Sequence, residues 1–418
     1  MTQSSVWSDS TGFDIPDDLR ARIRASLLDA CDWCVRNQVC DAWPDWDANT
    51  GRLPFNVDPD TGKSHLSIVW AIARAAQGML SAMKAAGDND LARIETAERA
   101  LFWATTLQLY SPEFPELNGA IVEETPLCRQ INPRDGMECS MGWLTKHWFD
   151  GPAADRLWML RARDHLQWTV NYLMQRPEWP LEYLFFGHSF SDETNRVPRR
   201  YGCADIRVRK PNSDLSFYNG ALLLPVCQYS KWTGDESMLN ASIGDMAEWV
   251  AGFIDADTGA FRHTGDALGH HGDTINGLSN VLSNDDGVVI ALLAYLQLRP
   301  DNDLLAVALK NCDWWLTVDK FGELFAPLSS SILLMLDAAR LTGRKDYLDW
   351  SLKMTGRLLK TQDLSGDPKR NGAFMGAERS GPKSHQMPCL RVTSYAMIAL
   401  SKLLATAETW SPSYSAFY

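Results

Sequence analysis

The chain has 418 residues, of which 45% are hydrophobic and 22% are charged, a balance typical of folded globular proteins rather than disordered ones. Its formal net charge of −12 argues against a dedicated nucleic-acid-binding protein, which would carry a basic stripe. The first fourteen residues lack the apolar core of a signal peptide, and no apolar run is long enough to span a bilayer. We therefore expect a cytoplasmic protein with no membrane or nucleic-acid partner, or a secreted or periplasmic one if a signal has been removed.

The nine cysteines are scattered along the chain. Cys31 and Cys34 form a C-x-x-C, but they fall inside a helical pattern and no second pair follows. This arrangement favours buried, reduced thiols over a zinc or redox site.

Apolar periodicity predicts helices along most of the chain. In chain order they are Asp17–Asn37, His65–Ala85, Leu91–Tyr110, Met141–Phe149, Ala153–Gln175, Ala221–Tyr229, Met238–Ile254, Val288–Leu298, Leu304–Trp315, Ser331–Ala339, Tyr347–Leu359 and Arg391–Thr406. Two long segments, Ser111–Met137 and Arg176–Asp214, carry few helix signals. Irregular segments of this length are uncommon in a compact domain and are often functional.

A helical hairpin followed by a Gly- and aromatic-rich loop recurs along the chain. The clearest copy has helices at Ala221–Tyr229 and Met238–Ile254, and it ends in the loop Asp255–Phe261. Repeated hairpins predict an array, either an open solenoid or a closed toroid. No change of composition marks a linker, so we expect one domain over residues 1–418.

The repeated hairpins and the loop pattern at Gly51–Phe55, Gly259–Phe261 and Gly372–Phe374 resemble the (α/α) toroids of carbohydrate-active enzymes. Those families include six-hairpin glycosidases, unsaturated glucuronyl hydrolases and several polysaccharide lyases, among them glucuronan and alginate lyases. The resemblance implies an all-α ring of six or seven hairpins, with the chemistry in long loops at one end. It is architectural, and fold alone does not fix function.

Two polar groups stand close together before the apolar helix Val288–Leu298. His270 and His271 lie in a Gly-flanked loop, where a proton-transferring role is easier to explain than packing. Asp285 and Asp286 either cap the helix or act as carboxylates at the toroid's mouth. Because no metal-ligand spacing accompanies them, we expect no metal and no other cofactor.

A basic run in an otherwise acidic chain includes Arg199 and Arg207 and leads to Tyr218 and Asn219, with His188 nearby. It is either a solvated surface or a patch that binds carboxylates through the forked guanidinium groups. Tyr218 and Asn219 stand at the start of an apolar helix, where a polar pair requires a reason.

Further candidate residues occur in other expected loops. They are Glu124 and Arg129, His385 and Arg391, which are either surface residues or substrate contacts, and Trp43 and Trp46, which suit stacking on a sugar ring.

These residue types fit β-elimination from a uronic-acid saccharide, an anionic carbohydrate substrate. In this hypothesis Tyr218 and His271 move protons, Arg199 or Arg207 with Asn219 holds the carboxylate, and Trp43 and Trp46 stack on the sugar. Hydrolysis by two carboxylates, with Asp285 or Asp286 paired with Glu124 or Asp214, is the alternative.

Two further functions stay open on the sequence alone. A terpenoid cyclase would use an acidic motif that Asn284-Asp285-Asp286 matches only in part. A non-catalytic helical scaffold is the other, although long loops rich in ionisable groups favour an enzyme. The sequence predicts no oligomeric state.

Overall fold

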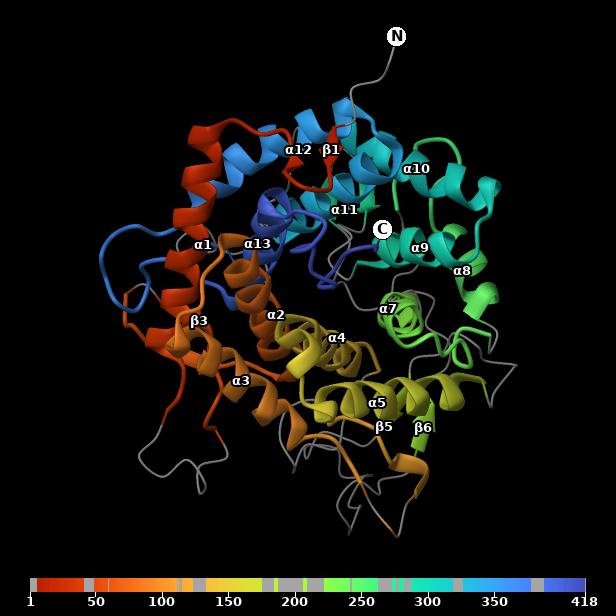
Figure 1. Ribbon diagram of the computed structural model, residues 1–418, viewed down its shortest axis with the longest axis horizontal. Helices are drawn as coiled ribbons and strands as arrows, with labels where there is room; N and C mark the ends of the chain where they lie inside the picture. Colours follow the sequence, from red (N-terminus) through yellow and green to blue (C-terminus); the bar gives the residue numbers. More distant parts are fainter. Residues whose placement is uncertain are drawn as a thin grey trace.

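The structure is a computed structural model that describes residues 6–40, 49–58, 60–110, 112, 115–122, 133–174, 184–186, 206–208, 222–240, 243–261, 273–275, 278–281, 287–318, 326–376 and 387–417. Within these residues, twelve α-helices form two concentric rings (Figure 1). The outer helices are α1 (Asp17–Asn37), α3 (Leu91–Thr105), α5 (Arg156–Met174), α8 (Ile243–Ala251), α10 (Asn302–Leu316) and α12 (Lys345–Leu358). The inner helices are α2 (Val69–Ala86), α4 (Pro133–Asp150), α7 (Leu223–Thr233), α9 (Val288–Leu298), α11 (Ala326–Thr342) and α13 (Leu390–Leu404).

The inner ring is closed. Each inner helix packs on the next, from α2 through α4, α7, α9 and α11 to α13, and α13 packs on α2. Six outer–inner pairs therefore confirm the predicted (α/α) toroid, in its six-hairpin form among the described residues.

Burial explains which helices lie inside. All fifteen residues of α13 and sixteen of the eighteen in α2 are buried, whereas only six of the fifteen in α3 are. A helix that is apolar on all sides must be surrounded by protein, and one with a single apolar stripe covers a core from outside.

The connections differ in length. Those from an inner helix to the next outer helix have nine residues or fewer: 87–90, 151–155, 234–242, 299–301 and 343–344. Those from an outer to an inner helix, which we call the long connections, have nine residues in one case and more than 25 in the others: 317–325, and 38–68, 106–132, 175–222, 252–287 and 359–389. Because outer and inner helices alternate, the inner helices run in the same direction, and every long connection ends at the N-terminal end of one of them.

Four antiparallel strand pairs accompany the helices in the described chain. They are β1 (Trp7–Ser8) with β2 (Gly12–Phe13), β3 (Pro54–Val57) with β4 (Ser64–Leu66), β5 (Leu184–Phe186) with β6 (Ile206–Val208), and β7 (Asp273–Ile275) with β8 (Leu278–Val281). In the third pair Arg207 lies opposite Phe185.

Several predicted helix boundaries are wrong, among them the end of α3, which is Thr105 instead of Tyr110, and the start of α11, which is Ala326 instead of Ser331. His65 belongs to β4, so α2 begins at Val69. Helix α4 begins at Pro133 instead of Met141. Its first turn shows no apolar periodicity and was therefore not predicted, but a proline is well accommodated there. The residues after Met238 form turns, and α8 begins at Ile243.

A C-terminal plug, residues 410–417, fills the centre of the ring near the C-terminal label in Figure 1. Ser413 shares hydrogen bonds with Ser81 of α2 at 2.9 Å and with Thr145 of α4 at 3.0 Å. Gln228 of α7 donates to the Ser415 carbonyl at 2.7 Å, and Lys402 of α13 donates to that of Ser411. Ser81, Thr145 and Lys402 belong to the later turns of their helices, so these contacts hold the plug toward the end of the ring where the inner helices finish.

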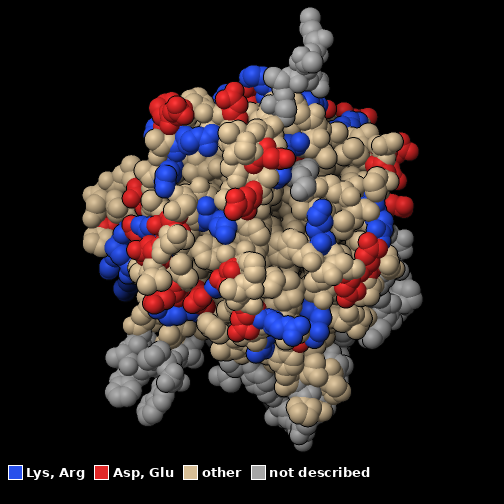
Figure 2. Space-filling view, in the orientation of Figure 1, with Lys and Arg blue, Asp and Glu red and all other residues tan. Residues whose placement is uncertain are grey.

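Most of the surface shown in Figure 2 mixes charges, with basic side chains interspersed among acidic ones. No helix among the described residues is long and apolar enough to cross a membrane. The two cysteines of the C-x-x-C are both fully buried in α1, and burial raises the pKa of the Cys34 thiol to about 12.

Candidate functional site at the N-terminal ends of the inner helices

Polar and aromatic side chains occupy equivalent positions in three inner helices. Trp70 is the second residue of α2, and Arg391 is the second residue of α13. Arg74, Glu138 and Tyr395 are each the sixth residue of α2, α4 and α13. Residues four apart share one face of a helix, so Trp70 lies above Arg74 and Arg391 above Tyr395. The five residues form what we call the N-terminal cluster.

A buried ion pair joins two of the helices. The guanidinium group of Arg74 contacts the carboxylate of Glu138, and neither side chain is exposed to solvent. Gln77 of α2 supports the same carboxylate, donating to the Glu138 backbone carbonyl at 2.9 Å and to Oε2 at 3.4 Å. Such a pair repays the loss of solvation only when further hydrogen bonds and close packing surround it.

Aromatic rings surround the Arg74 guanidinium carbon. It lies 4.2 Å from the ring centroid of Tyr395, 4.9 Å from that of Trp70 and 5.0 Å from that of Tyr414. These are cation–π distances, and the interaction is strongest where water is excluded. The Arg74 guanidinium thus belongs to one charge pair and lies against three aromatic rings.

Tyr414 reaches this cluster from the C-terminal plug. Its hydroxyl accepts a hydrogen bond from Arg74 at 2.8 Å, and its ring meets that of Tyr395 edge to face at 5.3 Å. Its φ of 42° is unusual for a residue with a side chain. A Cβ on Gly287, before α9, would come within 2.8 Å of the Tyr414 ring, so this ring needs a glycine there. Such strain persists where the surroundings fix the conformation.

Arg391 is the one predicted substrate-binding side chain that the structure describes. It lies in the first turn of α13, is 6% exposed, and its guanidinium carbon is 5.7 Å from the Trp70 ring centroid. Two arginines, Arg74 and Arg391, therefore approach one indole ring at the end of the ring where the long connections arrive.

Helix α4 offers two buried carboxylates. Asp135 and Glu138 are three residues apart, so they lie on neighbouring positions of one helix face, and their exposures are 2% and 0%. Among the described residues, no group of three or more His, Cys, Asp or Glu side chains is arranged to hold a metal ion.

The remaining predicted site residues lie outside the described residues, except that the backbone of Arg207 is described in β6. They are Trp43, Trp46, Glu124, Arg129, His188, Arg199, Tyr218, Asn219, His270, His271, Asp285, Asp286 and His385. In the chain, each belongs to a connection that leads from an outer helix to an inner one. Their roles stay predictions.

Sequence reasoning missed Trp70, Arg74, Glu138, Tyr395 and Tyr414. A usable signal existed in α2, where Arg74 is a charged residue within an alanine-rich helix that the periodicity already predicted. A charge in such a helix requires a buried partner. No comparable signal marks Tyr414, because its position depends on the chain returning to the ring's centre.

No protein-family model matches this chain, and no curated protein matches it in sequence. Solved structures do match in fold. Cellobiose 2-epimerase from Bacillus thermoamylovorans B4167 is similar with a TM-score of 0.63 at 10% identity, covering 93% of this chain and 99% of that one. The GH76A α-1,6-mannanase from Salegentibacter sp. HEL1_6 has a TM-score of 0.55 at 10% identity, covering 91% and 98%. An unsaturated glucuronyl hydrolase specific for heparin has a TM-score of 0.59 at 12% identity, covering 93% and 97%.

These matches confirm the predicted resemblance to toroidal carbohydrate-active enzymes at the level of the fold. At such low identity they carry no residue roles over to this chain.

Proposed function

We propose that this protein is an enzyme that processes a carbohydrate at the N-terminal ends of its inner helices. Three facts support this proposal. The long connections all lead to that end of the ring, the N-terminal cluster lies there, and the similar solved structures are described as enzymes of carbohydrates. Loops and helix ends on a rigid scaffold are where binding and catalytic groups concentrate.

The substrate we propose is anionic, and the observation that carries this is the approach of Arg74 and Arg391 to the Trp70 ring. Arg391 is the arginine that we propose to hold a substrate carboxylate, because it lies in the first turn of α13 beside the Trp70 ring. A guanidinium fork holds a carboxylate through two parallel hydrogen bonds. A neighbouring indole suits the apolar face of a sugar ring.

The reaction we propose first is β-elimination from a uronic acid. Neutralising the carboxylate acidifies the C5 proton, and a base removes it; the electron pair forms the C4=C5 double bond while the C4–O bond breaks and the leaving oxygen takes a proton. Tyr395, one turn along α13 from Arg391, is the described side chain suited to carry a proton. Tyr218 and His271 keep their predicted roles in the same step.

Hydrolysis is the second candidate, favoured by the pair of buried carboxylates on α4. Asp135 and Glu138 supply the two groups that such a reaction needs, one as acid and one as base or nucleophile. The similarity to a mannanase and to a glucuronyl hydrolase supports the same alternative.

The deciding experiment incubates the protein with glucuronan, alginate, pectate and glycosaminoglycans, following absorbance near 235 nm and reducing ends together. Elimination raises both signals, because it leaves a conjugated unsaturated uronate. Reducing ends without absorbance would replace the lyase with a hydrolase. Cellobiose is tested in parallel by NMR, and isomerised sugar there with no signal from the polymers would replace both with an epimerase. Silence in all three assays would remove the enzymatic proposal.

A further inference from the structure

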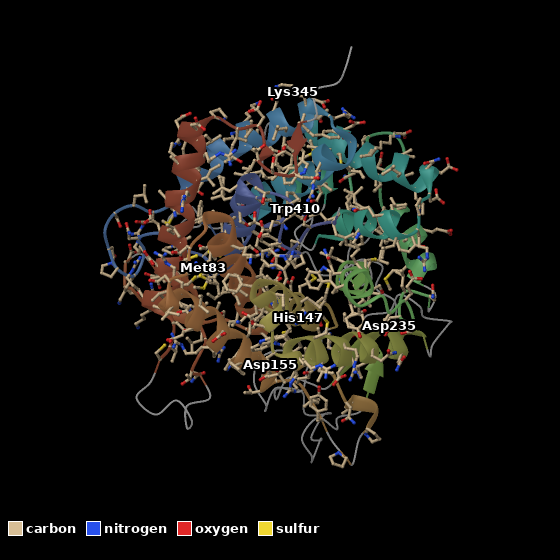
Figure 3. All side chains as sticks on the ribbon, in the orientation of Figure 1. Met83, His147, Asp155, Asp235, Lys345 and Trp410 are labelled. Carbon is tan, nitrogen blue, oxygen red and sulfur yellow. The ribbon has the colours of Figure 1, made fainter. Side chains whose placement is uncertain are left out.

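A pocket lies near the C-terminal ends of the inner helices α4, α7 and α11, where Trp148, Lys231 and Arg340 line it. Its volume is about 190 Å³, and residues of α4, α7, α11 and the C-terminal plug line it. Trp148, Trp232 and Trp410 provide three indole rings. Figure 3 shows Trp410 near the centre of the ring, well inside the outer helices. We call this the plug-end pocket.

Two cations also line the plug-end pocket. Lys231 of α7 is exposed and its Nζ lies 4.9 Å from the Phe417 ring centroid. The guanidinium carbon of Arg340 on α11 lies 4.5 Å from the ring centroid of Trp410. None of the described lining residues is acidic. The carboxylate of Asp337, three residues before Arg340 on α11, accepts hydrogen bonds from the plug at Ser415 and Ala416 and interacts electrostatically with Lys402. The pocket wall therefore favours an anion.

A buried amide oxygen adds a hydrogen-bonding site. Gln228 is 1% exposed and lines the pocket, and its Nε2 donates a hydrogen bond to the Ser415 carbonyl at 2.7 Å. Its Oε1 has no hydrogen-bond partner among the described residues. A buried acceptor in this state is costly unless water or a ligand donates to it. A hydroxyl group would satisfy it.

We propose that the plug-end pocket binds a single anionic sugar, separate from the substrate proposed above. The indole rings suit the apolar face of a sugar ring, Lys231 and Arg340 suit its acidic group, and Gln228 Oε1 accepts from one hydroxyl. The volume agrees with one ring rather than a chain, since pockets for drug-sized ligands measure roughly 300–1,000 Å³. The acidic group is a carboxylate or a phosphate, because both meet the same cations.

The test is calorimetric titration of the full chain with glucuronate, glucose 6-phosphate, glucose and inorganic phosphate. We expect a charged sugar to bind and glucose to bind at least tenfold more weakly; the better of the two charged sugars identifies the acidic group. If glucose binds with the same affinity as the two charged sugars, the anionic assignment is overturned. Phosphate binding as tightly as the sugars would overturn the assignment of a sugar, and no binding at all would overturn the site.

Variants then locate the binding. Lys231→Gln should weaken it about tenfold, the contribution of one charge-assisted hydrogen bond. Lys345→Gln is the matched control, because Lys345 lies on α12 at the outer edge of the molecule (Figure 3) and is 72% exposed. Arg391→Gln separates this site from the N-terminal cluster and should leave the affinity unchanged. Binding that survives Lys231→Gln, or that Arg391→Gln abolishes, would overturn the proposal while leaving the proposed function intact.

Discussion

Gln362 and Ser26 are 336 positions apart, yet their side chains and backbone are joined by two hydrogen bonds. Gln362 Nε2 donates to the Ser26 carbonyl at 2.9 Å, and Ser26 Oγ donates to Gln362 Oε1 at 2.6 Å. Since Gln362 follows the last outer helix and Ser26 belongs to the first, this contact closes the outer ring.

A similar glutamine contact joins the outer helices α1 and α3. Gln38 donates to the Gly51 and Thr96 carbonyls at 3.0 and 2.8 Å, and Gln362 repeats this with Gly372 at 2.9 Å. In both loops the glycine has a positive φ and lies against the backbone of the neighbouring outer helix. The Gly-x-x-x-Phe and Gly-Ala-Phe loops noted in the sequence therefore mark where one outer helix is fastened to the next.

The first prediction concerns that glycine. A Cβ at Gly372 would lie 2.1 Å from the Asp29 carbonyl oxygen, and its φ is +94°. Gly372→Ala should therefore lower the free energy of unfolding by about 3 kcal/mol or more in urea denaturation. Gly343→Ala is the control, because φ is also positive (+69°) but nothing lies within 4 Å. It should cost only about 1 kcal/mol. Equal losses would show that the contact with α1 contributes nothing.

The second prediction concerns the ion pair in the N-terminal cluster. Arg74→Met should cost about 3–5 kcal/mol of unfolding free energy, because it leaves the Glu138 carboxylate buried without its cation. Adding Glu138→Leu to that variant should recover part of the loss. The partly exposed pair Arg93–Asp32 is the comparison, and Asp32→Ala should cost about 1 kcal/mol or less, because Arg93 keeps its second partner Asp88. Simple additivity in the Arg74–Glu138 double-mutant cycle would contradict direct coupling.

The third prediction concerns the anchoring of the C-terminal plug. Asp337 accepts from Ser415 Oγ at 2.5 Å and from the Ala416 backbone at 2.7 Å. Asp337→Ala removes both acceptors and should destabilise the fold by about 2–4 kcal/mol, whereas Asp337→Asn can still accept one bond and donate the other. Thermal unfolding of the two variants measures the difference. The idea fails if alanine and asparagine behave alike.

The fourth prediction is a pH dependence. Burial raises the pKa of Asp337 to about 7, although the Lys402 charge opposes this, compared with an ordinary value of 3.8. Between about pH 4 and pH 7 the folded state therefore holds a proton that the unfolded state has lost, so this group makes stability fall as pH rises through that window. Burial lowers the pKa of Lys402, which has the opposite effect at higher pH, where folding releases a proton. Asp337→Asn should flatten the fall between pH 4 and pH 7 in denaturant titrations, and an unchanged slope would contradict the assignment.

The toroid could be predicted from sequence because its helices repeat a simple apolar pattern. Helices α1 and α9 have the predicted boundaries at Asp17–Asn37 and Val288–Leu298. The start of α4 could not be predicted in this way, because its first turn is polar and contains Pro133 and Gly136. Local pattern also carries no information about which distant groups meet.

The candidate site shows that limit. Arg391 was predicted as one of several charged residues grouped near the start of the last helix, but its neighbour Trp70 comes from a helix more than 300 residues earlier. Tyr414 depends on the C-terminal plug returning to the ring's centre, which no periodicity encodes. The other predicted site residues, such as Tyr218 and His271, lie outside the described residues and stay predictions.

The last prediction tests Arg391 as the group that holds a substrate carboxylate. Arg391→Gln should lower kcat/KM on a uronic polysaccharide by about 10- to 100-fold, because one charge-assisted contact contributes roughly 1.5–3 kcal/mol. Arg391→Lys keeps the charge but loses the planar fork, and it should fall between Gln and the wild type. Esterifying the substrate's carboxylates removes the anion that Arg391 is proposed to bind, so the wild type and Arg391→Gln should then show similar rates. Because Arg391 is buried, circular dichroism and thermal unfolding must first show that each variant is folded. A folded Arg391→Gln enzyme with undiminished kcat/KM on the free acid would remove Arg391 from substrate recognition.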